Sequence, residues 1–260
     1  MFGFIYTEIL YRPILNLLIY VYNIIPGHDI GIAIIILTII IKAVLWPLSK
    51  KSIKAQREMQ ELQPLMDEIK KKYKDKKEEM AKELMALYKT HKVNPMGSCL
   101  PLLIQFPFLI AVYRVFYDGF KPETLQKLYP FVAHPGTVNP MFLNLIDMSK
   151  PVVLLALLVG LAQFWQTKML IHTPQPKVDG SKDESMMANM NKQMMYFMPI
   201  ITVIIGFKLP SGLILYWLLT TLLTILQQYI FFKTQHKPIV AISNNIIEGE
   251  KIEEAKQIDK

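Results

Sequence analysis

The stretch from Ile30 to Leu48, IGIAIIILTIIIKAVLWPL, contains nineteen residues and a single ionisable side chain, Lys42. A helix needs ~20 predominantly apolar residues to cross a bilayer, so this run predicts a transmembrane helix. A lysine inside such a helix is costly unless water, a partner group or a cavity meets it, and it then usually serves a function. Alternatively, its flexible stem lets the ammonium reach the membrane interface. Position alone leaves both interpretations of Lys42 open.

Composition places the whole chain in the membrane class. Hydrophobic residues make up 52% of the 260 residues and occur in several long runs, which indicates an all-α polytopic membrane protein. The single cysteine, Cys99, and five scattered histidines form no disulfide framework, redox motif or metal-ligand spacing. No nucleophile with a base and no phosphate loop stands out. We therefore expect no enzyme, no cofactor and no metal site.

The net charge of +8 is concentrated in one segment. Residues 49–93 hold thirteen Lys or Arg against eight Asp or Glu, and the positive-inside rule makes this segment cytoplasmic. Its apolar residues recur at helical spacing on both sides of Asp75, which predicts a hairpin of two amphipathic helices. Topology thus explains the charge, and we expect no specific nucleic-acid binding.

The other segments complete a predicted topology of five transmembrane helices, with the N-terminus outside and the C-terminus in the cytoplasm. Residues 2–26 are apolar and rich in tyrosine but interrupted by Glu8, Arg12 and Pro13, which suits a helix in the outer interface; a sixth transmembrane helix is the alternative. The predicted order is an interfacial helix at 1–28, a first span at 29–48, the cytoplasmic hairpin at 49–98, a second span at 99–117, an outer loop at 118–150, a third span at 151–170, a cytoplasmic loop at 171–193, a fourth span at 194–208, a fifth span at 211–232 and a disordered tail at 233–260.

Four of the predicted spans also contain uncharged polar residues at membrane depth. Buried polar groups in lipid need partners or water, so their number suggests a hydrophilic groove; hydrogen bonds that only join helices are the alternative for any one of them. No intramembrane Asp or Glu is available to pair with the lysine, which favours a water-filled groove. The polar residues are Thr38 beside Lys42, Gln105, Gln163 with Gln166, and a stripe of Trp217, Thr220 or Thr221, Thr224 and Gln228.

Three segments together resemble the YidC/Oxa/Alb family of membrane protein insertases. They are IIIKAVLWPLSKKSIKAQREMQELQP, MALYKTHKVNPMGSCLPLLIQFPFLIAVY and FKLPSGLILYWLLTTLLTILQQ. The resemblance implies a five-helix core around a positively charged groove that opens to the cytoplasm and to lipid. It also implies a short bacterial form without the large periplasmic domain.

The resemblance gives roles to individual residues. Lys42 lies where the family usually has a groove arginine, and lysine keeps the charge without the guanidinium fork. The remaining predicted groove residues are Thr38, Gln105, Gln163, Gln166, Tyr216, Trp217, Thr221 and Thr224.

The implied function is insertion of nascent proteins into the bacterial inner membrane, alone or with the Sec translocon. The groove would shorten the hydrophobic path, and Lys42 would attract acidic residues of the entering segment. The partners expected are nascent membrane proteins, the lipid bilayer and, through the 49–98 hairpin, the Sec translocon, the ribosome and signal-recognition targeting factors. An anion or solute transporter using Lys42 as its site and a scaffold protein remain as alternatives.

Overall fold

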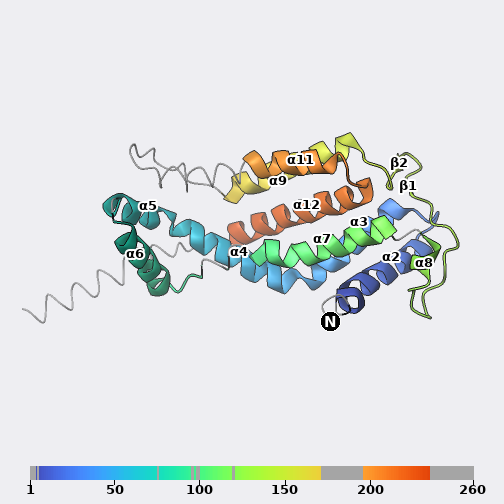
Figure 1. Ribbon diagram of the computed structural model, residues 1–260, viewed down its shortest axis with the longest axis horizontal. Coiled ribbons are helices and arrows are strands. Elements are labelled where there is room, and N and C mark those ends of the chain that lie inside the picture. The colour runs from blue at the N-terminus through green and yellow to red at the C-terminus, as the bar shows by residue number, and fades with distance from the viewer. Residues whose placement is uncertain are drawn as a thin grey trace, which may run out of the picture.

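The fold is mostly helical, with the long helices running alongside one another (Figure 1). The computed structural model describes residues 4, 6–74, 76–94, 97, 100–118, 121–170 and 196–234, and the side chains of 100–104, 122 and 170 are not among them. Nearly all of the predicted loop at 171–193 and tail at 233–260 therefore lies outside the described residues.

Helix α12 (Ser211–Thr234) is the centre of the bundle. It packs against α9 (Val153–Leu170), α3 (Ile30–Val44), α7 (Leu100–Asp118) and α4 (Trp46–Glu61). Within the described residues α12 is the one helix that is by itself long and apolar enough to cross a membrane; α3 and α4 meet the same test only when taken together. Helix α9 is apolar but shorter than that test requires over its described part.

Helix α3 begins at a capped end and finishes at a sharp bend. The Asp29 carboxylate accepts a hydrogen bond from the Ile32 amide at 2.9 Å, as an N-cap does, and also one from the Leu143 amide. The helix ends at Val44, four residues before the end predicted for the first span, and α4 begins at Trp46 at an angle of 68° to it. Pro47 lies in the first turn of α4, where a missing amide hydrogen is tolerated.

Helices α9 and α11 (Met198–Gly206) lie side by side because small residues let their backbones approach (Figure 1). A methyl group added at Gly206 would come within 2.9 Å of the Ala156 Cβ, and one added at Gly160 would meet Val203. Such small-residue contacts are typical of helix pairs in membranes, where there is little hydrophobic force to hold helices together.

The N-terminal segment forms a π-helical turn, η1 (Thr7–Tyr11), and α2 (Arg12–Ile24), which is hydrogen-bonded to the loop that follows α7. Asn16 is buried; its amide donates to the Arg12 carbonyl, and its oxygen accepts the Tyr129 amide at 2.5 Å. The Arg12 guanidinium also lies over the Tyr129 ring, 4.8 Å from its centre. These contacts fix α2 across the bundle beside α3 and α7.

The segment predicted as an outer loop, 118–150, contains structure that the sequence did not predict. It holds a short helix, α8 (Pro122–Leu125), and an antiparallel pair of two-residue strands, β1 (Met141–Phe142) and β2 (Ile146–Asp147). The Ser149 hydroxyl donates to Asp147, and this bond, assisted by Lys150, holds the pKa of the carboxyl below its ordinary value.

At the other end of the molecule, α4 leads to α5 (Gln63–Lys72) and α6 (Lys77–Thr90) (Figure 1). The two helices pack against each other on either side of position 75. A small apolar cluster holds them, built on Leu62, Met66 and Val93.

Candidate functional site

The centre of the candidate site is Lys42 in the last turn of α3. Its Nζ donates a hydrogen bond of 2.7 Å to the Thr224 hydroxyl on α12, across 182 residues of sequence. The side chain is partly buried, and within the described part of the chain no carboxylate lies within ion-pair distance of it. The ammonium is therefore directed at a neighbouring helix and has a neutral partner there.

Thr224 is held ready to accept this bond. Its own hydroxyl proton is donated to the Thr220 carbonyl one turn earlier at 2.7 Å, so its oxygen lone pairs face the lysine. Thr38, which shares a face of α3 with Lys42, is fully buried and donates to the Ile34 carbonyl at 2.6 Å. Its hydroxyl is thus used within its own helix.

A second polar contact lies farther along α12. The Gln105 amide on α7 donates to the Tyr216 hydroxyl at 3.0 Å, and Tyr216 is only 1% exposed. Because Tyr216 is enclosed between helices, an apolar segment could pass it only if α7 moved away from α12. The sequence predicted Tyr216 as a groove residue, and in the structure it forms a buried contact between helices.

The remaining predicted groove residues form no hydrogen bond with either of these two pairs among the described residues. Trp217 and Thr221 are linked to each other, because the Thr221 hydroxyl donates to the Trp217 carbonyl at 2.9 Å. They lie about 100° and 140° around the helix from Tyr216. Gln163 and Gln166 on α9 are partly buried. Among the described residues, the Gln163 side-chain oxygen is buried without a hydrogen-bond partner. None of these four side chains forms a hydrogen bond with Lys42 in the described part of the chain.

Sequence reasoning missed three polar residues of α4. Ser52 is 1% exposed, Gln56 accepts a hydrogen bond from Gln228 of α12, and Gln60 has a buried amide nitrogen. Their spacing of four residues, which puts them on one face of a helix, was the available signal. The sequence analysis assigns this segment only to the predicted amphipathic hairpin.

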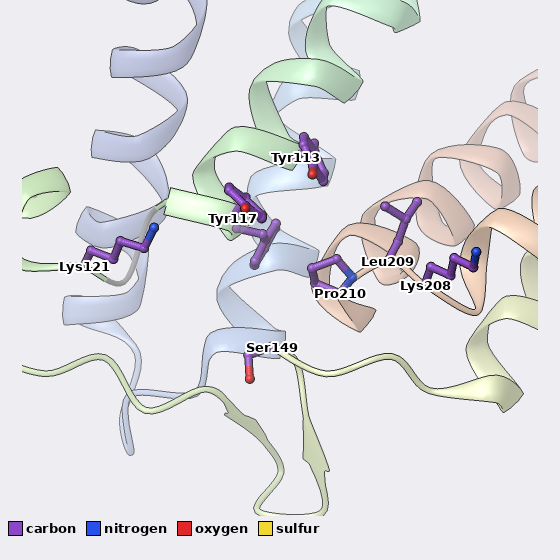
Figure 2. A pocket seen from close by; sticks show the side chains of 8 residues that line it. Tyr113, Tyr117, Lys121, Ser149, Lys208, Leu209 and Pro210 are labelled. Atoms are coloured by element: carbon purple, nitrogen blue, oxygen red, sulfur yellow. The ribbon is translucent and has the colours of Figure 1, made fainter.

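A pocket of about 470 Å³ lies at the opposite end of the bundle, near β1 and β2 (Figure 2). It contains none of the predicted groove residues, and Figure 2 shows Lys121 and Lys208 at opposite ends of it. The Lys121 ammonium lies over the Tyr117 ring, 5.4 Å from its centre. The pocket is lined by Tyr113, Phe116, Tyr117, Lys121, Ser149, Lys208, Leu209 and Pro210.

Comparison with known families decides where this arrangement belongs. Residues 20–238 match the model of the family described as 60Kd inner membrane protein. The chain belongs to this family. The match includes every helix that contributes to the Lys42 and Tyr216 contacts.

Individual members of the 60Kd inner membrane protein family agree with this assignment. "Membrane protein insertase YidC" of Fusobacterium nucleatum is 38% identical over 205 residues, which are 79% of this chain and 87% of that one. The protein of the same name from Syntrophus aciditrophicus is 39% identical over 219 residues, but these are only 35% of its length. For the Nitratidesulfovibrio vulgaris protein the figures are 36% over 228 residues and 38% of its length. The chain thus spans little more than a third of these two longer relatives.

A solved structure of the family has the same fold. The crystal structure described as "Active YidC insertase crystal structure with the first transmembrane domain resolved" superposes with a TM-score of 0.56 at 25% sequence identity. The superposition covers 86% of this chain and 46% of the other.

Proposed function

We propose that this chain is a membrane protein insertase, which moves nascent proteins into a bacterial inner membrane along a groove centred on Lys42. The observation that carries the proposal is the Lys42 ammonium, which turns to a neutral hydroxyl on α12 and has no carboxylate partner in the described part of the chain. A cation placed in this way is available to an acidic group from outside. Relatives named as insertases support this function over solute transport.

The proposed topology has five transmembrane helices, with the N-terminus outside and the α5–α6 hairpin in the cytoplasm. The hairpin would then receive the substrate or a targeting factor, a ribosome or the Sec translocon. Its basic balance supports this orientation through the positive-inside rule. Helices α3, α7, α9, α11 and α12 are the proposed spans, and α2 lies at the outer interface.

The driving force is partition of the apolar segment into lipid. At about −0.3 to −0.6 kcal/mol per apolar residue, a segment of ~20 residues gains roughly 6–12 kcal/mol. An Asp at the centre of the bilayer costs ~2.5–3.5 kcal/mol on the same type of scale. Lys42 needs only to offset part of that cost while a short acidic tail crosses. Neither ATP nor a metal is required by this balance.

Reconstitution tests the proposal directly. The purified chain is placed in sealed vesicles and supplied with a single-span substrate whose N-terminal tail contains two Asp, or two Asn in their place. Protection of the tail from added protease measures insertion. We expect Lys42→Gln to lower insertion of the Asp tail about tenfold, equivalent to ~1.4 kcal/mol, and to leave the Asn tail unchanged.

Two control variants make the result specific. Lys42→Arg keeps the charge and should retain insertion of both tails. Lys208→Gln removes an exposed lysine at the far end of the bundle and should affect neither tail. Equal loss for the Asp and Asn tails in Lys42→Gln would contradict the charge mechanism. A saturable flux of small anions without any insertion would favour a transporter.

A further inference from the structure

Polar residues recur every four positions along α12, at Tyr216, Thr220, Thr224 and Gln228, in a stripe that turns slowly around the helix. Three of the four have hydrogen bonds to neighbouring helices. In order along α12, Tyr216 contacts α7, Thr224 contacts Lys42 of α3, and Gln228 contacts α4. The series runs from the interior of the bundle to the end where α4 departs toward the hairpin (Figure 1).

The last contact in this series is the weakest. The Gln228 amide donates to the Gln56 side-chain oxygen at 3.4 Å, beyond the usual 2.7–3.2 Å range for such bonds. Gln228 is nevertheless only 1% exposed, and its own side-chain oxygen has no hydrogen-bond partner in the described part of the chain. We call the contact between α4 and α12 around Gln56 and Gln228 the α4–α12 seam. It contains an amide group that forms fewer hydrogen bonds than it could.

A second buried polar group lies close along α4. The Ser52 hydroxyl, one helical turn before Gln56, is 1% exposed and has no hydrogen-bond partner among the described residues. Buried polar groups are nearly always paired in folded proteins, so unpaired ones need an explanation such as a ligand or bound water. Gln228, Gln56 and Ser52 are uncharged, and together they offer both donors and acceptors.

The α4–α12 seam lies close to a bend about which α4 could rotate away from α12. Helix α4 joins α3 through Leu45 alone, at a bend of 68°. Hinges consist of a few residues at the ends of such elements, so a small rotation of α4 about Leu45 would separate Gln56 from Gln228. The movement would release the Gln228 amide to a new partner, and the bond that it gives up is a long one.

We propose that the α4–α12 seam is a second substrate-binding site, which holds the main chain of an extended polypeptide segment before it reaches Lys42. This inference rests on the proposed insertase function. A glutamine side chain presents one donor and one acceptor, which match the carbonyl and amide of a peptide unit whatever its side chain. The seam therefore binds without regard to sequence, whereas Lys42 selects acidic residues.

The geometry fixes the register between the two sites. Thr224 and Gln228 are separated by four residues of helix, or ~6 Å along its axis. An extended chain advances ~3.3 Å per residue, so this distance corresponds to about two substrate residues. A peptide unit at Gln228 would accordingly present an acidic side chain to Lys42 about two residues farther along.

Substitution of the seam residues tests the site. We expect Gln228→Leu to lower insertion of Asp-tailed and Asn-tailed substrates by the same factor, about fivefold to tenfold, while the thermal unfolding temperature stays level or rises because an unpaired buried acceptor is removed. Ser52→Ala, the smaller change, should act in the same direction. Tyr229→Leu, at an exposed neighbour of Gln228, should have no effect. Unchanged insertion in Gln228→Leu and Ser52→Ala overturns the proposal, and so does a parallel fall of insertion and unfolding temperature in both.

Crosslinking supplies a readout that a packing role would not give. In a Cys99→Ser background, Gln228→Cys and the control Tyr229→Cys are each paired with stalled nascent chains that contain one cysteine at successive positions. Disulfide formation with Gln228→Cys should peak about two residues from the Asp that depends on Lys42, and Tyr229→Cys should show no peak. A flat profile with Gln228→Cys overturns the site.

The two proposals can fail separately. If insertion depends on Lys42 but not on Gln228 or Ser52, the seam proposal fails and the insertase proposal stands. If the wild-type chain inserts no substrate, the insertase proposal itself fails.

Discussion

Replacing Lys42 by methionine separates its role in function from its role in folding. A charge at the centre of a membrane helix costs ~2.5–3.5 kcal/mol, and less near a helix end; Lys42 lies two residues from the end of α3. Against this, a hydrogen bond from a charged donor, here to Thr224, contributes ~1.5–3 kcal/mol. The two effects nearly cancel. We expect Lys42→Met to change the free energy of unfolding by less than ~1 kcal/mol and to abolish the preference for acidic tails.

The assay is reversible unfolding in mixed micelles, followed by tryptophan fluorescence and compared with insertion by the same preparation. Adding Thr224→Val and the double variant gives the coupling energy between the two side chains. If water reaches the ammonium, it replaces the lost hydroxyl and the coupling stays below ~1 kcal/mol. A loss above ~3 kcal/mol in Lys42→Met would refute the reasoning, because Lys42 would then be a structural group whose removal unfolds the site.

Other consequences follow from single contacts. Gly206→Ala should destabilise the α9–α11 pair by ~1–3 kcal/mol, since the new methyl lies 2.9 Å from the Ala156 Cβ, and Ala156→Gly should restore the unfolding midpoint. A double-mutant cycle of Tyr216→Phe with Gln105→Leu should give a coupling of about 0.6 kcal/mol, the average for interhelical hydrogen bonds in membranes, and zero coupling would deny the bond. Asp147 has a lowered pKa in the folded state, so it stabilises the fold above the ordinary carboxyl pKa of ~3.9 and this stability is lost as the pH falls through the folded value. Asp147→Asn should therefore flatten the acid side of a stability–pH profile, and an unchanged profile would show that the carboxyl is not coupled to folding.

Local sequence patterns predicted those parts of the fold that depend on local physics. The apolar run that begins at Ile30 forms α3 as far as Val44, and the run after Lys208 forms α12, because the apolar pattern of a long helix is contained in the helix itself. The bend at Leu45 was not predicted, although Pro47 lies two residues after it. A proline at the start of a helix is compatible with either a continued or a new helix direction, so its tertiary neighbours decide.

Contacts between distant segments could not be predicted from the sequence. Lys42 and Thr224 were each selected as polar groups at membrane depth, but nothing in one sequence says that they meet across 182 residues. The enclosed position of Tyr216 depends in the same way on how α7 packs against α12. The β1–β2 turn was hidden because Leu143 and Asn144 both adopt positive φ, where glycine is the usual signal and leucine is not.

A charge exchange between insertase and substrate tests the central claim most directly. Lys42→Glu is assayed in sealed vesicles with three otherwise identical substrates, whose tails contain two Asp, two Asn or two Lys. The account predicts that the wild type prefers the Asp tail and that Lys42→Glu rejects it and gains insertion of the Lys tail, with the Asn tail unchanged in both. Equal insertion of the three tails by the two proteins would contradict a substrate-attracting charge at Lys42.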